Sequence, residues 1–106
     1  MTRNEIENIF ELHLVKNYGI SKDSPLLPPL GYALLDCIRE LVQVKRKYSP
    51  VCLNYASACY HRYRGLCAAV LWMEDFDVYN RLCALGDTVN AQIREIGRQH
   101  DRFDLV

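Results

Sequence analysis

Five cysteines and three histidines give this 106-residue chain many side chains that can bind a soft metal ion. Zinc sites usually draw on closely spaced ligands such as C-x-x-C or H-x-x-x-H, and neither pattern occurs here. Cys52, Cys59 and Cys67 instead recur about every two helical turns, a spacing typical of small apolar side chains in a helix core. We therefore predict no metal and no cofactor, and we interpret all the cysteines as reduced core residues: Cys37, Cys52, Cys59, Cys67 and Cys83.

Covalent catalysis by a cysteine needs an accessible thiolate beside a base or a cation. Cys59 comes closest, with His61 and Arg62 nearby in the sequence, although burial of Cys59 explains the same pattern. The chain has no G-x-S-x-G, P-loop, G-x-G-x-x-G or Glu-x-x-His sequence. We therefore expect a protein that is not an enzyme. An enzyme or ligand carrier stays an alternative, and a buried pocket holding Cys59, His61 and a carboxylate would indicate it.

A cluster of aromatic and cationic residues is the strongest candidate for binding a macromolecule. Such side chains can contact phosphates and stack on bases, or anchor a protein interface. Arg62 and Arg64 can equally pair with acidic residues of neighbouring helices. Because 13 basic residues balance 13 acidic ones, we expect a protein partner before nucleic acid. The candidate partner-binding residues are Lys45, Arg46, Lys47, Tyr60, Arg62, Tyr63 and Arg64.

The N-terminal half predicts two helices joined by a proline-rich connection. Thr2-x-x-Glu5 has the spacing of a capping box, which begins a helix over residues 2–18. Three of the four prolines fall within residues 20–30, where each disfavours helix in the residue before it. An amphipathic pattern then predicts a second helix over residues 29–48.

The C-terminal half predicts two longer helices. Ser49 and Pro50 supply the N-cap and the first position of a helix over residues 50–73, which is apolar on two sides and needs cover on both. Asp75 or Asp77 can cap a last helix over residues 76–102.

This last helix carries an apolar stripe with alternating spacings of three and four residues. Such a stripe is usually core within one chain. Two long apolar helices share only two shorter partners, however, so we also expect a homodimer contact through it. The candidate self-association residues are Leu82, Gly86, Val89, Ile93, Ile96 and Phe103.

These patterns predict one all-α domain over residues 1–106, a four-helix bundle-like fold with a long antiparallel hairpin of its third and fourth helices. The most apolar segment, residues 65–73, is too short to span a bilayer, so we expect no membrane association. The N-terminal residues lack the apolar core and cleavage site of a secretory signal, and we therefore expect a cytoplasmic protein.

The expected function follows from these features. We predict a small intracellular, non-enzymatic interaction protein, such as a regulator, adaptor or inhibitor. It would bind another protein through a helical surface and self-associate. The alternative is a nucleic-acid-associated helical protein that uses the local basic and aromatic patches. Binding to nucleic acid would weaken steeply as salt rises, whereas an apolar interface would respond little.

Overall fold

The computed structural model describes residues 1–105, and within that range it contains four α-helices and no strand. The all-helical fold class predicted from the hydrophobic periodicity is therefore confirmed. The helices are α1 (Arg3–Tyr18), α2 (Leu27–Arg46), α3 (Pro50–Val70) and α4 (Phe76–Gln99).

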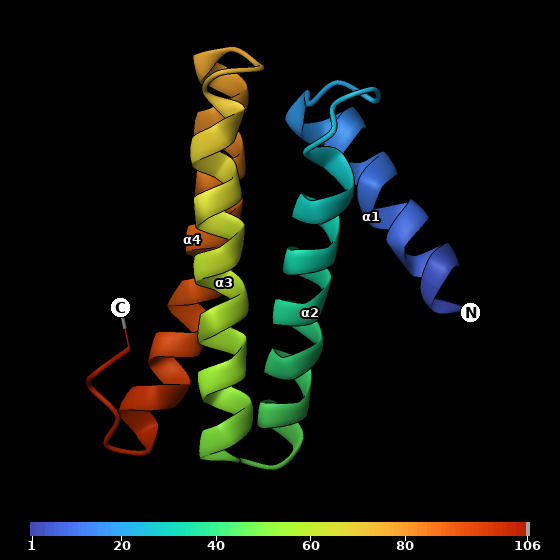
Figure 1. Ribbon diagram of the computed structural model, residues 1–106. Helices are drawn as coiled ribbons and strands as arrows, with labels where there is room; N and C mark the ends of the chain where they lie inside the picture. The colour runs from blue at the N-terminus through green and yellow to red at the C-terminus, as the bar shows by residue number, and fades with distance from the viewer. Residues whose placement is uncertain (106) are drawn as a thin grey trace.

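Helices α2 and α3 lie side by side, α4 lies behind α3 in this view, and α1 leans across the outer side of α2 (Figure 1). The helix α3 packs against both α2 and α4, whereas α1 packs mainly on α2. The Cα radius of gyration is 14.0 Å, close to the value of about 13 Å expected for a compact domain of 100 residues. The domain is flattened, with extents of 41 × 32 × 17 Å, so a large fraction of its residues lies near a surface.

Side-chain caps fix where three helices begin. The Thr2 hydroxyl accepts a hydrogen bond from the Glu5 backbone N–H at 3.2 Å, and Ser49 does the same for Cys52 at 3.3 Å. Asp75, rather than Asp77, caps α4, because its carboxylate accepts from the Val78 N–H at 2.9 Å. Each cap satisfies an N–H that has no partner inside its helix.

Helix α2 differs at both ends from the predicted range 29–48. It begins at Leu27, because proline is tolerated in the first turn of a helix, where the missing N–H has no helical acceptor. It ends at Arg46, and Lys47 is already extended. Ser49 is also extended, as expected for a residue that precedes proline. The link to α3 therefore takes up the last residues that the periodicity had assigned to α2.

Helices α3 and α4 both end three residues earlier than predicted, at Val70 and Gln99. After α4, Asp101 adopts a left-handed backbone with φ of 59°. The N–H of Arg102 then donates to the Gly97 carbonyl at 2.7 Å, and that of Asp101 donates to Arg98 at 3.2 Å. This is the bonding pattern of a Schellman motif, which closes the helix before residue 102.

Helix α3 packs tightly on α4 where the Tyr63 ring lies against Gly86. Tyr63 is fully buried, and its hydroxyl donates to the Leu82 carbonyl at 2.6 Å. A Cβ atom placed on Gly86 would lie only 2.6 Å from the ring carbon Cε1 of Tyr63. A glycine at position 86 is therefore required for the observed packing of these helices.

Replacing this glycine should separate α3 from α4. We expect Gly86→Ala to lower the free energy of unfolding by about 1–3 kcal/mol, because the tyrosine ring must move. Gly65→Ala is the matched control, since nothing lies within 4 Å of its new Cβ. It should raise stability by about 0.5–1 kcal/mol through helix propensity alone. Urea unfolding of the two variants measures both effects, and equal changes would contradict the packing described here.

Candidate functional site

The two tyrosines of the predicted partner-binding cluster lie between α3 and α4. Tyr63 belongs to the core, as described above, so it is not available to a partner. Tyr60 is also buried, and its hydroxyl donates to the Asp87 carboxylate at 2.9 Å. Burial and the neighbouring carboxylate raise the pKa of Tyr60 to about 12. Both tyrosines therefore join two helices of the chain, which corrects their prediction as interface anchors.

The two arginines of the same cluster point to different neighbours. Arg62 pairs with Asp36 of α2, with Nη2 and Oδ2 separated by 3.2 Å. Arg64 faces α4 instead, where its Nε lies 4.0 Å from the Asp87 carboxylate. Two residues apart on a helix means about 200° of rotation, so adjacent cations in the sequence become opposite cations in space. The cluster is therefore not one continuous patch.

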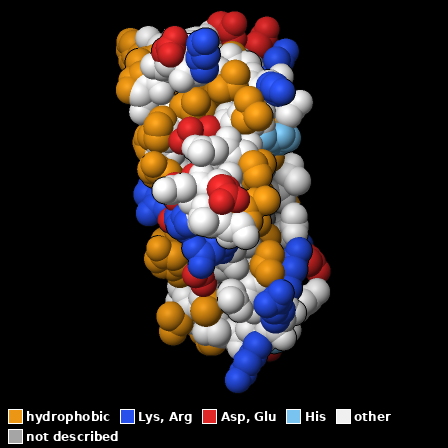
Figure 2. Space-filling model, turned by 90° about the vertical axis from the view of Figure 1, so that its right-hand side faces the viewer, with side chains coloured by type: hydrophobic (Ala, Val, Ile, Leu, Met, Phe, Trp, Pro, Cys, Tyr) orange, Lys and Arg blue, Asp and Glu red, His pale blue; other side chains and the backbone are white. Residues whose placement is uncertain are grey.

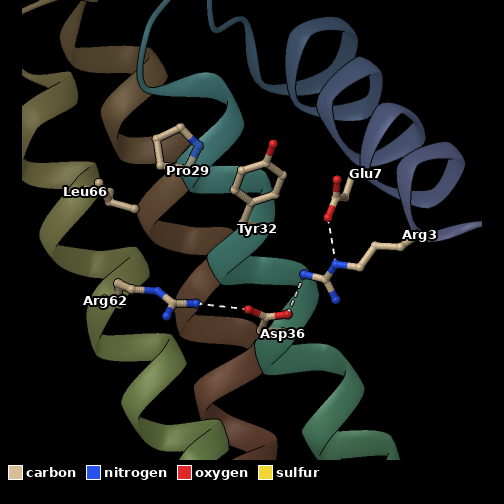
Figure 3. A pocket seen from close by; sticks show the side chains of 7 residues that line it. All are labelled: Arg3, Glu7, Pro29, Tyr32, Asp36, Arg62 and Leu66. Atoms are coloured by element: carbon tan, nitrogen blue, oxygen red, sulfur yellow. Dashed lines mark hydrogen bonds and ion pairs between the residues drawn. The ribbon is translucent and has the colours of Figure 1, made fainter.

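Arg62 lines a groove between α1, α2 and α3, with a volume of about 490 Å³. Asp36 is central in it, because Arg3 of α1 and Arg62 of α3 approach its carboxylate from opposite sides (Figure 3). Arg3 also pairs with Glu7 at 2.7 Å. The remaining lining residues are Pro29, Tyr32 and Leu66. The groove thus joins three helices by paired charges, and its cations are already matched by carboxylates.

The basic residues at the end of α2 form a separate surface. Lys45, Arg46 and Lys47 are exposed, and Lys45 donates to the Gln92 side-chain oxygen of α4 at 2.6 Å. Arg62 lies twelve residues into α3, about 18 Å along the helix from the turn that follows these lysines. The predicted basic residues are therefore spread over three surfaces, and the aromatic ones are buried.

Most of the predicted self-association stripe is buried within the single chain. Leu82, Gly86, Val89 and Ile93 lie in the core, and Ile96 is half-buried against it. Phe103, which follows the end of α4, is 74% exposed. The buried members cannot contact a second copy without opening the fold, so these four residues form core within the chain.

The most exposed apolar cluster lies in the turn between α3 and α4, where no site was predicted. Four large apolar side chains within six residues are exposed there: Leu71, Trp72, Met73 and Phe76. Trp72, the only tryptophan of the chain, is 90% exposed. We call these four residues the Trp72 turn. The helix predicted over residues 50–73 included Met73, whereas α3 ends at Val70 and Met73 is exposed.

Polar contacts hold the Trp72 turn in place. The Ser21 backbone N–H donates to the Glu74 carboxylate at 2.9 Å, which ties the turn to the segment between α1 and α2. The Asp75 carboxylate caps α4, and the Glu74 N–H donates to the Val70 carbonyl at 2.8 Å. Trp72 is therefore exposed on an ordered turn. Three acidic residues follow it closely in the sequence, namely Glu74, Asp75 and Asp77.

The thiols and imidazoles do not converge on a reactive centre in the part of the chain that the structure describes. No group of three or more His, Cys, Asp or Glu side chains within residues 1–105 is placed to hold a metal ion. Cys59 is buried, and burial raises the pKa of its thiol. His61 is exposed, with its ring meeting Tyr60 edge-on at 5.0 Å. The pair that could have supported catalysis is thus split between core and surface.

Comparison with known proteins finds no match to a family model, to a curated protein or to a solved structure. Among residues 1–105, no helix is long and apolar enough to cross a membrane.

The buried thiols should resist alkylation in the folded protein. Burial raises the pKa of Cys37 and of Cys67 to about 12, so at pH 8 only about one thiol in 10⁴ is ionised. Cys52 is only half-buried and should react first with iodoacetamide. Mass spectrometry of timed samples gives the order, and denatured protein, in which all thiols react, is the control. Labelling of Cys37 or Cys67 as fast as Cys52 would contradict this burial.

Proposed function

We propose that this chain is a small cytoplasmic, non-enzymatic interaction protein that regulates, links or inhibits another protein by binding it through a helical surface. The Trp72 turn is the observation that supports this proposal. Folded monomers rarely leave several large apolar side chains exposed together, and such patches commonly mark interaction sites. Tryptophan is also among the residues most enriched at the energetic centres of interfaces.

The position of the turn suits it to insertion into a pocket of the partner. In this proposal α3 and α4 form an antiparallel hairpin of a four-helix bundle-like domain, and the Trp72 turn is its tip. The turn is already ordered by the bond from Ser21 to Glu74 and by the Asp75 cap, so little conformational entropy is lost when a partner binds. The partner would need an apolar pocket for the Trp72 ring.

The charges near the Trp72 turn indicate what should surround the pocket of the partner. Glu74, Asp75 and Asp77 follow Met73 and flank Phe76 in the sequence, and acidic residues favour a partner surface that carries lysine or arginine. The same charges disfavour nucleic acid at this turn. The basic residues that suggested nucleic acid are spread over separate surfaces, and both Arg62 and Arg64 face carboxylates. We therefore favour a protein partner with a basic rim.

The Trp72→Ala variant tests the proposal directly. The tagged full chain is used to capture a partner from native lysate, and the purified partner is then titrated against each variant. Trp72→Ala should weaken binding about 30-fold or more, the loss of about 2 kcal/mol typical of a central tryptophan. Helix content by circular dichroism should stay unchanged, because Trp72 contributes little to the core.

Val51→Ala is the matched control for this experiment. Val51 is 75% exposed and lies at the opposite end of α3, about 30 Å from the Trp72 turn. It should leave the affinity unchanged. Equal binding by the native chain and Trp72→Ala would refute the turn as the docking site. Binding that depends steeply on salt and is competed by nucleic acid would favour the alternative function instead.

A further inference from the structure

Helix α1 has an apolar stripe on the side that faces away from the rest of the molecule. Its inner side packs on α2 through Leu14, which is fully buried, and through Phe10. On its outer side, Ile9 and Leu12 are 52% and 53% exposed. The face that carries α1 shows hydrophobic side chains among the charged ones (Figure 2). A helix at the edge of a soluble domain usually presents polar residues on its outer side, so this apolar stripe indicates a contact with a partner.

The outer stripe consists of four exposed residues at helical spacing. Glu5, Ile9, Leu12 and Lys16 are separated by four, three and four positions, which places them along one line of the helix. Leu14 lies about 180° away, on the inner side. The stripe therefore has an acidic end, an apolar centre and a basic end. We call these four residues the α1 stripe.

This order of charges complements a second copy of the same stripe in the reverse direction. In an antiparallel pair related by a two-fold axis, Ile9 of each copy meets Leu12 of the other. Glu5 of each copy then meets Lys16 of the other, which gives two equivalent ion pairs. A parallel pair would instead place Glu5 on Glu5 and Lys16 on Lys16, and like charges at this spacing repel. The charge pattern selects one orientation.

An apolar groove beside the stripe enlarges the surface that a second copy can cover. It has a volume of about 320 Å³ between α1, α2 and α4, and Ile9 lines it as well as belonging to the stripe. The other lining residues are Phe10, His13, Leu34, Ile38 and Leu85. A helix docked on the stripe would therefore also cover one edge of this groove. Two 16-residue helices alone bury less than the roughly 800 Å² per partner of a standard interface, so the expected affinity is modest.

We propose that the chain forms a two-fold symmetric homodimer through an antiparallel pair of α1 helices, with Ile9 and Leu12 at its centre and Glu5–Lys16 ion pairs at its ends. This proposal goes beyond the proposed function: it keeps the self-association predicted from the sequence and moves it from α4 to α1. Unlike the buried α4 stripe, the α1 stripe is accessible without any change of fold.

Sedimentation velocity of the full chain over a concentration series tests for the dimer. The native chain should shift from monomer to dimer between about 1 µM and about 1 mM. Ile9→Glu should raise the dissociation constant at least about tenfold, because it puts a charge into the apolar centre. Val51→Glu, at an exposed valine of α3, is the matched control and should dimerise like the native chain. Circular dichroism checks that the variants stay folded.

Charge variants and cross-linking test the orientation. Glu5→Lys and Lys16→Glu should each dimerise poorly alone, because every end pair becomes repulsive, and the equal mixture should dimerise again. Carbodiimide should also join Glu5 to Lys16 between copies. Mass spectrometry of mixed ¹⁴N and ¹⁵N native chains identifies that link, since the two residues lie about 16 Å apart along one helix and cannot join within a copy.

Three results would overturn the proposal: a monomer at every concentration, a dimer that survives Ile9→Glu, or a dimer without the mixed-isotope link. Failure here is distinguishable from failure of the proposed function. Ile9→Glu should keep the affinity for the protein partner that depends on Trp72. If the chain is a strict monomer and its affinity for the partner is intact, only the dimer proposal is wrong. If the chain dimerises and Trp72→Ala leaves its affinity for the partner unchanged, only the proposed docking site is wrong.

Discussion

The whole arrangement depends on α3 being apolar on two sides. One side is covered by α2 and the other by α4, and the close contact of Tyr63 with Gly86 fixes the second of these interfaces. Once both long neighbours are used in this way, α1 packs mainly on the remaining side of α2, with a smaller contact to α4. Helix α1 therefore lies at one side of the molecule, outside α2, as Figure 1 shows. The exposed stripe of α1 follows from this shortage of cover.

The polar residues of α3 repeat this two-sided arrangement. Arg62 reaches an aspartate on α2, and Arg64 and Tyr60 reach an aspartate on α4. Exposed ion pairs contribute little to stability on their own, but they favour one angular setting of each helix over others. Residues that look like a binding cluster in the linear sequence thus orient α3 between its neighbours. The surface that a partner can contact therefore lies on other elements.

Sequence patterns could predict the existence of all four helices because each has a cap or a proline with local meaning. Thr2, Ser49 and Asp75 cap as their spacing suggests. The ends of α3 and α4 were harder to predict, since they depend on turns that form only in the folded chain, such as the left-handed Asp101. The three-residue error at the end of α3 concealed the Trp72 turn. The run of Trp72, Glu74 and Asp75 in the sequence is the signal that could have revealed it.

The candidate sites were harder to predict than the helix ends, because periodicity shows that a stripe is apolar but does not show what covers it. The α4 stripe and the α1 stripe have similar spacings, yet one is core and the other is exposed. Only the three-dimensional assignment of α2 and α4 to the two sides of α3 separates these cases. Likewise, a helix turns about 100° per residue, so cations that are neighbours in sequence diverge in space.

The two proposed surfaces are compatible because they lie at different places on the domain. The C-terminal end of α1 leads into Ser21, which bonds to Glu74 beside the Trp72 turn. In an antiparallel α1 pair these ends point in opposite directions and lie about the length of α1 apart, about 24 Å. Such a dimer would present its turns at opposite ends. It could therefore bind two partner molecules at once, and a divalent or surface-bound partner would be held more tightly than a single turn allows.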